Sequence, residues 1–179
     1  MRRNLAQFGG KRQLSFRFKI RFFLWFYLCA LIFESKFSNI KFKIALLNLF
    51  GGDVGDKVVL KSGIKIHFPW NLSIGDNSWI GEHVWFINHE KVKIGSNVCI
   101  SQSAILCSGG HDYRSATLEY SHKPIEIKDG AWICLDSKVL PGVTIGECSV
   151  VAAGEIARMS VPDYSMLIAG EIRPIDPPK

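Results

Sequence analysis

The sequence predicts a mainly β repeat protein, in which short strands stack into a solenoid behind a helical N-terminal segment. Three observations predict this fold. Aliphatic residues recur every six positions from Val54 onward, and Gly, Asn or Asp often follows them, whereas residues 1–50 show no such repeat. A period of six matches neither 3.6 nor 2. It fits a short strand followed by a tight turn in which Gly, Asn or Asp accepts a positive φ.

Residues 1–50 carry most of the positive charge. The chain has 22 Lys/Arg and 16 Asp/Glu among its 179 residues, with 47% hydrophobic residues, a composition that excludes a disordered chain. The only acid before residue 51 is Glu34, and ten basic residues surround it: Arg2, Arg3, Lys11, Arg12, Arg17, Lys19, Arg21, Lys36, Lys41 and Lys43. The remainder of the chain is therefore slightly acidic.

The strongest apolar run, Phe22 to Phe33, lies in this basic segment. It has 12 residues without a charge, and a bilayer span needs about 20. No A-x-A-like cleavage site follows in ESKFSN, so a signal peptide is not expected. Two compatible interpretations remain: a helix that caps the open end of the solenoid, or an in-plane helix in peripheral contact with a membrane. We expect no nucleic-acid binding, because the aromatic residues are clustered as an apolar face.

Five cysteines, an odd number without CxxC spacing, argue against a disulfide framework or a zinc ribbon. We interpret them as small buried residues of a reducing compartment. This predicts a cytoplasmic protein, associated with the inner face of the membrane if the basic segment binds lipid.

The repeat itself is cleanest near the C-terminus. One register runs six residues apart without error, with small or branched companions four residues later: Ile127, Ile133, Val139, Ile145, Val151 and Ala157, with Ala131, Ser137, Val143 and Ser149. Both series should point inward from successive strands and form continuous ladders. A single hexad cannot bury its apolar face alone, so neighbouring coils must complete the core.

Two interruptions break the repeat, around INHEK (87–91) and over HDYRSATLEYSHKP (111–124). Loops that leave a rigid scaffold are where binding and catalysis concentrate, and an excursion of 14 residues is long for a compact repeat. The alternative is a loop that only packs on a neighbouring subunit. His111 lies at the root of the longer loop, directly after Gly109 and Gly110.

The phrases IGDNSWIGEHVW, IGSNVCISQSA and LPGVTIGECSVVAAG resemble the hexapeptide-repeat acyltransferases. The resemblance covers about residues 50–170 and implies a left-handed parallel β-helix with triangular coils of three hexads. The strings HFPWNLSIGDNSWIGEHVW and CISQSAILCSGGHDY are similar to the colanic acid biosynthesis acetyltransferase branch, related to galactoside and maltose acetyltransferases. We therefore expect a helical segment over 1–50, an acyltransferase β-helix over 51–170 with an excursion loop at 111–124, and a C-terminal tail over 171–179.

On the acceptor side, the resemblance implies that His111 is the general base. Attack of a sugar hydroxyl on a thioester requires removal of the hydroxyl proton, and the pKa of histidine suits that transfer at neutral pH. Asp112 either orients the imidazole, contacts the acceptor or hydrogen-bonds its own loop. Asn88 and Tyr113 are candidate acceptor contacts. His122 is expected to be a solvated loop residue.

On the donor side, the resemblance implies an acetyl-CoA site along the C-terminal coils, between subunits of a homotrimer. By match to VAAGEIARMSVP, Ala153 lies along the pantetheine arm and Arg158 is a polar contact. Arg173 is a candidate for a phosphate of coenzyme A, although AGEIRP (169–174) departs from the family ending AGxPAR. Cys134 and Leu135 also replace smaller residues of the family pattern.

The sequence thus predicts an acetyl-CoA-dependent O-acetyltransferase, without a metal, in exopolysaccharide or lipopolysaccharide biosynthesis. Its expected acceptor is a hydroxyl of a sugar or of a lipid-linked sugar. Two other functions remain open. A non-catalytic β-helix assembly module would explain the departures in the donor pattern. A zinc carbonic-anhydrase-like enzyme would require His83, His89 and His111 to converge.

Overall fold

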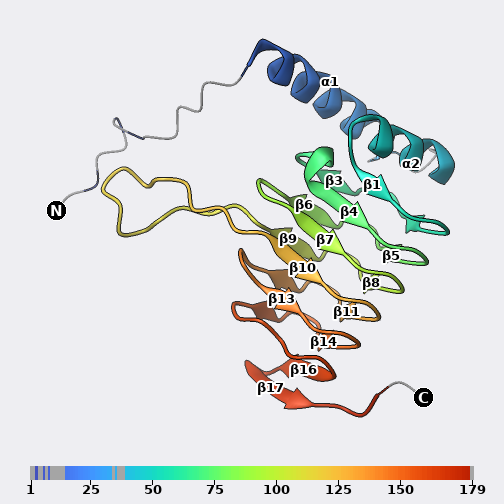
Figure 1. Ribbon diagram of the computed structural model, residues 1–179, viewed down its shortest axis with the longest axis vertical. Helices are drawn as coiled ribbons and strands as arrows, with labels where there is room; N and C mark the ends of the chain where they lie inside the picture. Colours follow the sequence, from blue (N-terminus) through green and yellow to red (C-terminus); the bar gives the residue numbers. More distant parts are fainter. Residues whose placement is uncertain are drawn as a thin grey trace.

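The computed structural model describes residues 3, 6, 8, 15–33, 35 and 39–177. Stacked coils of short strands form a solenoid with two helices at one end, and a long loop leaves its side (Figure 1). The basic residues Arg2, Lys11, Arg12 and Lys36, and the acid Glu34, lie outside the described residues. The helices are α1 (Phe16–Ile32) and α2 (Ile40–Leu49), and a 3₁₀ turn, η2, spans Pro69–Asn71.

Three sheets form the walls of the solenoid. Up to β15, each strand that has a next partner pairs in parallel with the strand three places later in the chain, whereas β14 pairs with β16. Sheet A contains β1 (Asp53–Val54), β4 (Leu72–Ile74), β7 (Val92–Ile94), β10 (Ile125–Ile127) and β13 (Thr144–Ile145). Sheet B contains β2 (Val59–Leu60), β5 (Trp79–Ile80), β8 (Cys99–Ile100), β11 (Trp132–Ile133), β14 (Val150–Val151), β16 (Ser165–Ile168) and the antiparallel β17 (Glu171–Pro174). Sheet C contains β3 (Lys65–Ile66), β6 (Trp85–Ile87), β9 (Ile105–Cys107), β12 (Lys138–Val139) and β15 (Ile156–Ala157).

The repeat residues form the core, because side chains alternate between the two faces of each strand. In sheet B the inward ladder runs through Leu60, Ile80, Ile100, Ile133, Val151 and Leu167, all buried. Asn77 and Asn97 occupy the turns with φ of 57°. The prediction of a left-handed parallel β-helix behind a helical segment is therefore confirmed.

Helices α1 and α2 cover the first coil and share its core. Trp25 and Phe33 of the α1 segment and Leu47 of α2 are almost fully buried with the strand residues. The indole Nε1 of Trp25 donates to the carbonyl oxygen of Ile66 at 2.7 Å. Lys43 is 2% exposed, and its Nζ donates to the carbonyl oxygen of Lys61 at 3.0 Å. The helices thus cover the apolar core of the first coil and hydrogen-bond to two of its carbonyl groups.

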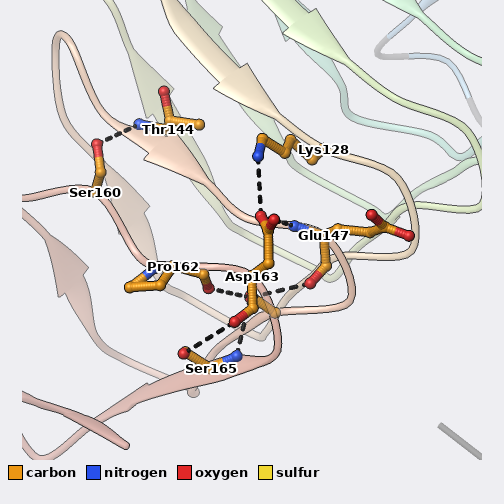
Figure 2. A network of polar contacts seen from close by, with 8 residues as sticks. Lys128, Thr144, Glu147, Ser160, Pro162, Asp163 and Ser165 are labelled. Atoms are coloured by element: carbon orange, nitrogen blue, oxygen red, sulfur yellow. Dashed lines mark hydrogen bonds and ion pairs between the residues drawn. The ribbon is translucent and has the colours of Figure 1, made fainter. Parts of the chain in front are cut away.

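The last coil is closed by polar contacts and by β17, the part of the C-terminal tail that pairs with β16. Figure 2 shows Asp163 accepting from the Nζ of Lys128 at 2.9 Å and from the backbone N–H of Glu147 at 2.8 Å. Asp129 makes the same cross-coil contact to Ser96. These carboxylates join successive coils at the turns that follow sheet A.

The five cysteines are free thiols, but only Cys29 and Cys134 are buried. The expectation that all five are buried is wrong, since Cys99, Cys107 and Cys148 are partly exposed. Among the described residues, neither helix is long and apolar enough to cross a bilayer.

Candidate active site

Both interruptions of the repeat lie on one edge of the solenoid, where sheet C turns into sheet A. We call this the C–A edge; it comprises residues 67–71, 87–91, 107–124, 140–143 and 158–161. Because the coils stack, these turns lie above one another. The edge therefore gathers His67, His89, His111 and His122, which are far apart in the sequence.

His111 is held at the base of the long loop by an antiparallel bridge to Tyr120. The backbone N–H groups of Asp112 and Ser121 donate to Glu119 and Gly110, both at 2.8 Å. His111 and Tyr120 are therefore a non-hydrogen-bonded pair, with side chains close together on the same face. Their ring centroids are 5.1 Å apart.

The imidazole of His111 is exposed, and its Nδ1 lies 2.6 Å from the carbonyl oxygen of Leu118. A carbonyl oxygen can only accept, so Nδ1 carries the proton in this contact. The neutral ring then has its lone pair on Nε2. Leu118 has a φ of 50°, and this left-handed conformation sets the direction of its carbonyl group.

A row of aromatic rings leads from His111 along the edge. Tyr120 lies 4.8 Å from His122, and His122 stacks on His89 at 4.9 Å. The Nδ1 of His122 accepts from the N–H of Gly110 at 3.2 Å. His122 is therefore part of the packed edge, and its assignment as a solvated loop residue was wrong. His67 continues the row at 5.7 Å from His89.

The two glycines before His111 permit this packing. A Cβ atom on Gly109 would lie 2.7 Å from Cδ2 of His89, and one on Gly110 would lie 3.0 Å from the carbonyl oxygen of Ser121. A Cβ contact as short as that at Gly109 essentially never occurs in proteins, and the contact at Gly110 would be unusually tight. The Gly-Gly pair thus brings the start of the loop against the histidine row.

Asp112 is bonded to Arg114 within the excursion loop. Its Oδ1 accepts from both the backbone N–H and the Nε of Arg114, at 3.0 and 3.1 Å. The backbone hydrogen bond from Arg114, with its side-chain bond, lowers the pKa of Asp112. Of the three roles considered, this geometry corresponds to bonding within its own loop. Tyr113 is 75% exposed, with the guanidinium of Arg114 near its ring.

Asn88 is fully buried below the same edge. Its Oδ1 accepts from the N–H of Phe68 at 3.0 Å, and its Nδ2 donates to the carbonyl oxygen of Phe68 at 2.6 Å. Both ends of the amide are therefore occupied by backbone. Asn88 joins two successive turns of the C–A edge, and its side chain has no group directed to the surface.

The donor-side candidates lie on different parts of the coil. Arg158 follows β15 and is exposed on the C–A edge, two coils beyond the root of the His111 loop. Ala153 is exposed on the turn between sheets B and C, next to Leu135, whose carbonyl accepts from Gly154. Arg173 is on β17 and pairs with Glu171 at 2.9 Å. Within one chain these three residues do not converge.

Sequence reasoning missed three residues near His111. Phe8 of the N-terminal segment lies 5.7 Å from His111 and 5.2 Å from Tyr120, between ring centroids. No spacing rule connects position 8 to position 111. Tyr120 and His122 are two residues apart, and this alternation across the bridge is the one signal that could have paired them with His111.

Burial at the edge favours the neutral imidazole of His67 and of His89. Burial lowers the pKa of His67, and burial followed by the charges of His122, His67 and His111 lowers the pKa of His89. Within the described residues, no three His, Cys, Asp or Glu side chains converge as metal ligands. His83 lies on the turn between β5 and β6, a different edge from His89 and His111, so within one chain the trio that a zinc enzyme would require does not come together.

Comparison with known proteins finds relatives that are described as acetyltransferases. The chain is 37% identical over 140 residues to an Escherichia coli protein described as the colanic acid biosynthesis acetyltransferase WcaF, covering 78% of this chain and 77% of the relative. It is 29% identical to the galactoside O-acetyltransferase of E. coli over 129 residues, 70% of this chain and 63% of the relative. No family profile matches the sequence.

Among solved structures, a hexapeptide-repeat acetyltransferase from Vibrio cholerae, complexed with acetyl coenzyme A, superposes with a TM-score of 0.81. The two are 25% identical, over 90% of this chain and 89% of that chain. A galactoside acetyltransferase in complex with coenzyme A has a TM-score of 0.80 at 22% identity, over 92% and 84% of the chains. The second likeness concerns the fold alone.

Proposed function

Because the chain belongs to the hexapeptide-repeat acyltransferase family, and is an acetyl-CoA-dependent acyltransferase, we propose that it transfers the acetyl group to a sugar hydroxyl. The relatives named for colanic acid biosynthesis and for galactosides support a carbohydrate acceptor. We further propose that this acetylation belongs to exopolysaccharide or lipopolysaccharide assembly.

The contact of His111 Nδ1 with the carbonyl oxygen of Leu118 carries the proposal. It fixes the tautomer in which Nε2 is the basic nitrogen, on an exposed imidazole. A base with a fixed tautomer at the surface of a rigid edge can accept a proton from a bound alcohol. This arrangement supports the proposal that His111 is the base for a weakly acidic sugar hydroxyl.

The proposed reaction uses His111 twice. Nε2 removes the hydroxyl proton as the sugar oxygen attacks the thioester carbonyl carbon, and a tetrahedral oxyanion forms. When the C–S bond breaks, the coenzyme A thiolate leaves and takes the proton from His111. The sugar ester and the free thiol are the products, and the enzyme returns to its starting protonation state.

The surroundings of His111 favour a carbohydrate. The rings of Phe8 and Tyr120 lie beside the imidazole and offer apolar faces to the C–H groups of a sugar. Tyr113 and Asp112 stand further along the loop as candidate acceptor contacts. Asn88 contributes by holding the turn at Phe68.

For the donor, we propose a path along the C–A edge from His111 toward Arg158, whose guanidinium suits a phosphate of coenzyme A. Ala153 lies on the neighbouring edge, so a second subunit would complete the site. A homotrimer is supported by the outward ladder of the parallel strands of sheet B, which is apolar up to the pairing of Met166 with Arg173: Val59, Trp79, Cys99, Trp132, Val150 and Met166. The outward residues of sheet A are mostly polar or charged.

We also propose that the protein acts in the cytoplasm and binds the membrane surface peripherally. The five free thiols favour a reducing compartment. On α1, Phe16, Phe23 and Leu31 are 77%, 59% and 71% exposed, and Arg17 and Lys19 are exposed on the same helix. Such a mixture of exposed apolar and basic side chains binds anionic lipid surfaces.

The test is release of coenzyme A thiol from acetyl-CoA with a panel of sugars, glycosides and nucleotide sugars. We expect acceptor-dependent thiol release that His111→Ala abolishes, and a trimer in sedimentation. A folded protein that binds acetyl-CoA but acetylates no acceptor would refute the sugar proposal. Failure to bind acetyl-CoA at all would favour the assembly module.

A further inference from the structure

The two ends of the excursion loop meet at Gly110, the residue before His111. The carbonyl oxygen of Gly110 accepts from the backbone N–H of Ser121 at 2.8 Å, and its N–H donates to the imidazole Nδ1 of His122 at 3.2 Å. Ser121 and His122 lie on the returning end of the loop. The backbone directly before the proposed base is therefore held through both of its polar groups, one of them by a side chain.

The imidazole of His122 takes the place of a backbone acceptor. The N–H of Lys123 donates to the carbonyl oxygen of Ser108 at 3.0 Å. This bond and the one from Ser121 to Gly110 follow a single antiparallel register, in which the N–H of Gly110 would donate to the carbonyl oxygen of Ser121. It donates to the ring of His122 instead. His122 thus completes the ladder at the root of the loop.

The preceding coil fixes the ring of His122. His89, on the turn after β6, stacks on this ring at 4.9 Å with an interplanar angle of 23°, and Tyr120 lies 4.8 Å from it. The N–H of Gly110 is therefore bonded to a group that is itself packed against the solenoid. Contacts from His89 through His122 to Gly110 connect the rigid coil to the backbone that carries His111.

The bond to Gly110 depends on the protonation state of His122. An N–H can only donate, so Nδ1 of His122 accepts with its lone pair, and the neutral ring carries its proton on Nε2. An imidazolium has a proton on both nitrogens and accepts no hydrogen bond. His111 uses the opposite tautomer, with Nδ1 as the donor to Leu118. The loop root is thus built from two neutral imidazoles with different tautomers.

Other titratable groups surround His122. Within the described residues, the ionisable side chains of the row come from three segments: His67 after β3, His89 after β6, and His111 and Tyr120 in the excursion loop, with the exposed Lys123 next in sequence. Burial, followed by the charge of His122, lowers the pKa of His89. The pH response of the row therefore belongs to several histidines, and a variant must isolate the part of His122.

We propose that His122 is a positioning residue of this enzyme, which in its neutral form fixes the backbone at Gly110 and so holds the imidazole of His111 in position. The inference rests on the proposed sugar O-acetyltransferase activity and specifies its regulation. Protonation of His122 in mild acid removes the acceptor, releases the N–H of Gly110 and lets the loop root move. Acetyl transfer then needs two neutral histidines, one that accepts the proton and one that holds the backbone.

The bond is tested first without acyl transfer, by hydrogen exchange of the Gly110 amide in the full chain, measured by NMR at pH 7.5. Asparagine and leucine at position 122 form a matched pair, because their shapes are similar and only asparagine has an acceptor oxygen on Cγ, where histidine has Nδ1. We expect His122→Asn to keep the wild-type protection of Gly110 and His122→Leu to lower it at least about tenfold.

The amide of Trp132, which is bonded to Ser149 across the coils, is the reference for global stability and should be equally protected in all three proteins. Equal protection of Gly110 in His122→Asn and His122→Leu would show that position 122 does not hold this backbone, and would overturn the proposal.

Acyl transfer then measures what the bond does for the base. At pH 7.5 we expect His122→Leu to lower kcat about 10- to 100-fold, because a small displacement of a reacting group has an effect of this size. His122→Asn should retain most of the wild-type kcat, and the KM for acetyl-CoA should stay unchanged in both variants. A merely structural role would lower the stability and leave the kcat of the folded protein unchanged. Equal kcat values for the two variants would overturn the inference and leave the proposed function standing.

The pH profile isolates the proton on His122. His111 titrates in the wild type and in His122→Asn alike, but the asparagine amide takes up no proton in this range. Between pH 7.5 and 5.0, on either side of the ordinary histidine pKa, kcat/KM of the wild type should fall at least about tenfold more than that of His122→Asn. Protection of Gly110, relative to Trp132, should fall over the same range in the wild type alone.

A wild-type to His122→Asn ratio of kcat/KM that does not change with pH would overturn the proton dependence. If the wild type acetylates no sugar, the proposed function fails by itself. The exchange of Gly110 at pH 7.5 and 5.0 then still decides whether neutral His122 holds the backbone before His111.

Discussion

The Nδ1 nitrogen of His111 and the carbonyl oxygen of Leu118 lie 2.6 Å apart, seven residues from each other along the excursion loop. This contact relates the loop to the chemistry, since a loop that only covered the coil would not need to fix one imidazole tautomer. It also separates two quantities that can be tested independently: the presence of the base and its orientation.

Replacement of the base should remove the chemical step and preserve the fold. We expect His111→Gln to lower kcat about 10²- to 10⁴-fold, the usual contribution of a general base. His83→Asn is the matched control, because His83 is an exposed histidine at φ 59° on another edge, and asparagine tolerates that conformation. Thiol-release kinetics measure both; equal kcat values for the two variants would contradict the role of His111.

Loss of the orientation of the His111 imidazole should lower kcat less than loss of the imidazole itself. Leu118 has a φ of 50°, which proline cannot adopt and glycine adopts freely. We expect Leu118→Pro to turn the carbonyl away and lower kcat about 10- to 100-fold, as when an oriented imidazole loses its partner. Leu118→Gly should stay near wild type. If both variants are equally active, the Leu118 contact does not control the base.

Asn88 should prove to be a residue that stabilises the edge. Asn88→Asp keeps an acceptor for the N–H of Phe68 but loses the donor to its carbonyl group, in a fully buried position. We expect a loss of about 1–3 kcal/mol in the free energy of unfolding, measured with urea. A variant with unchanged stability and a raised KM for the acceptor would instead indicate direct contact with the sugar.

The histidine row should make the protein less stable in mild acid. The folded-state pKa of His89 is lowered, chiefly by burial, so between its ordinary value and the lowered one the unfolded chain binds more protons. The free energy of unfolding therefore falls as the pH decreases through this window below about 6.5, and the histidine has no effect above it. His89→Gln should show a smaller decrease in unfolding midpoint between pH 7.5 and 5.0 than wild type. An identical decrease would contradict the effect.

The fold could be predicted from the sequence because each six-residue repeat contains the residues that determine its own strand and turn. Ile133 and Val151 are 18 residues apart, which is three repeats of six, and this spacing makes them direct neighbours in sheet B. Asn77 and Asn97 mark turns by their tolerance of positive φ. Strand, turn and stacking are thus encoded locally and repeated, which is why a single sequence suffices.

The site could be predicted only in part, since its geometry depends on contacts between coils. The position of His111 at the loop root was readable from the broken repeat. The carbonyl group of Leu118, the approach of Phe8 and the stacking of His122 on His89 arise from segments without a repeat, so no period relates them. Asn88 illustrates the same difficulty: its type suggests a sugar contact, but its burial under the edge is set by the preceding coil.

Two buried serines on the inner ladders should differ in their effect on stability. Ser149 donates to the carbonyl oxygen of Pro162 at 2.5 Å and accepts from the N–H of Ser165 at 3.1 Å, so it joins one coil to the next. Ser137 is equally buried, but its hydroxyl bonds only to Cys134 in its own turn, at 2.7 Å.

Ser149→Ala leaves the buried N–H of Ser165 and the carbonyl group of Pro162 without this partner, so we expect it to lower the free energy of unfolding by about 1–3 kcal/mol. Ser137→Ala should cost less than about 1 kcal/mol, because the carbonyl of Cys134 keeps its bond from the N–H of Ser137. Urea unfolding measures both, and hydrogen exchange should show the loss in Ser149→Ala concentrated in the last coil around Ser165, since stability in a solenoid is transmitted between neighbours. Equal losses in the two variants would mean that burial alone, and not the bond between coils, makes these serines necessary.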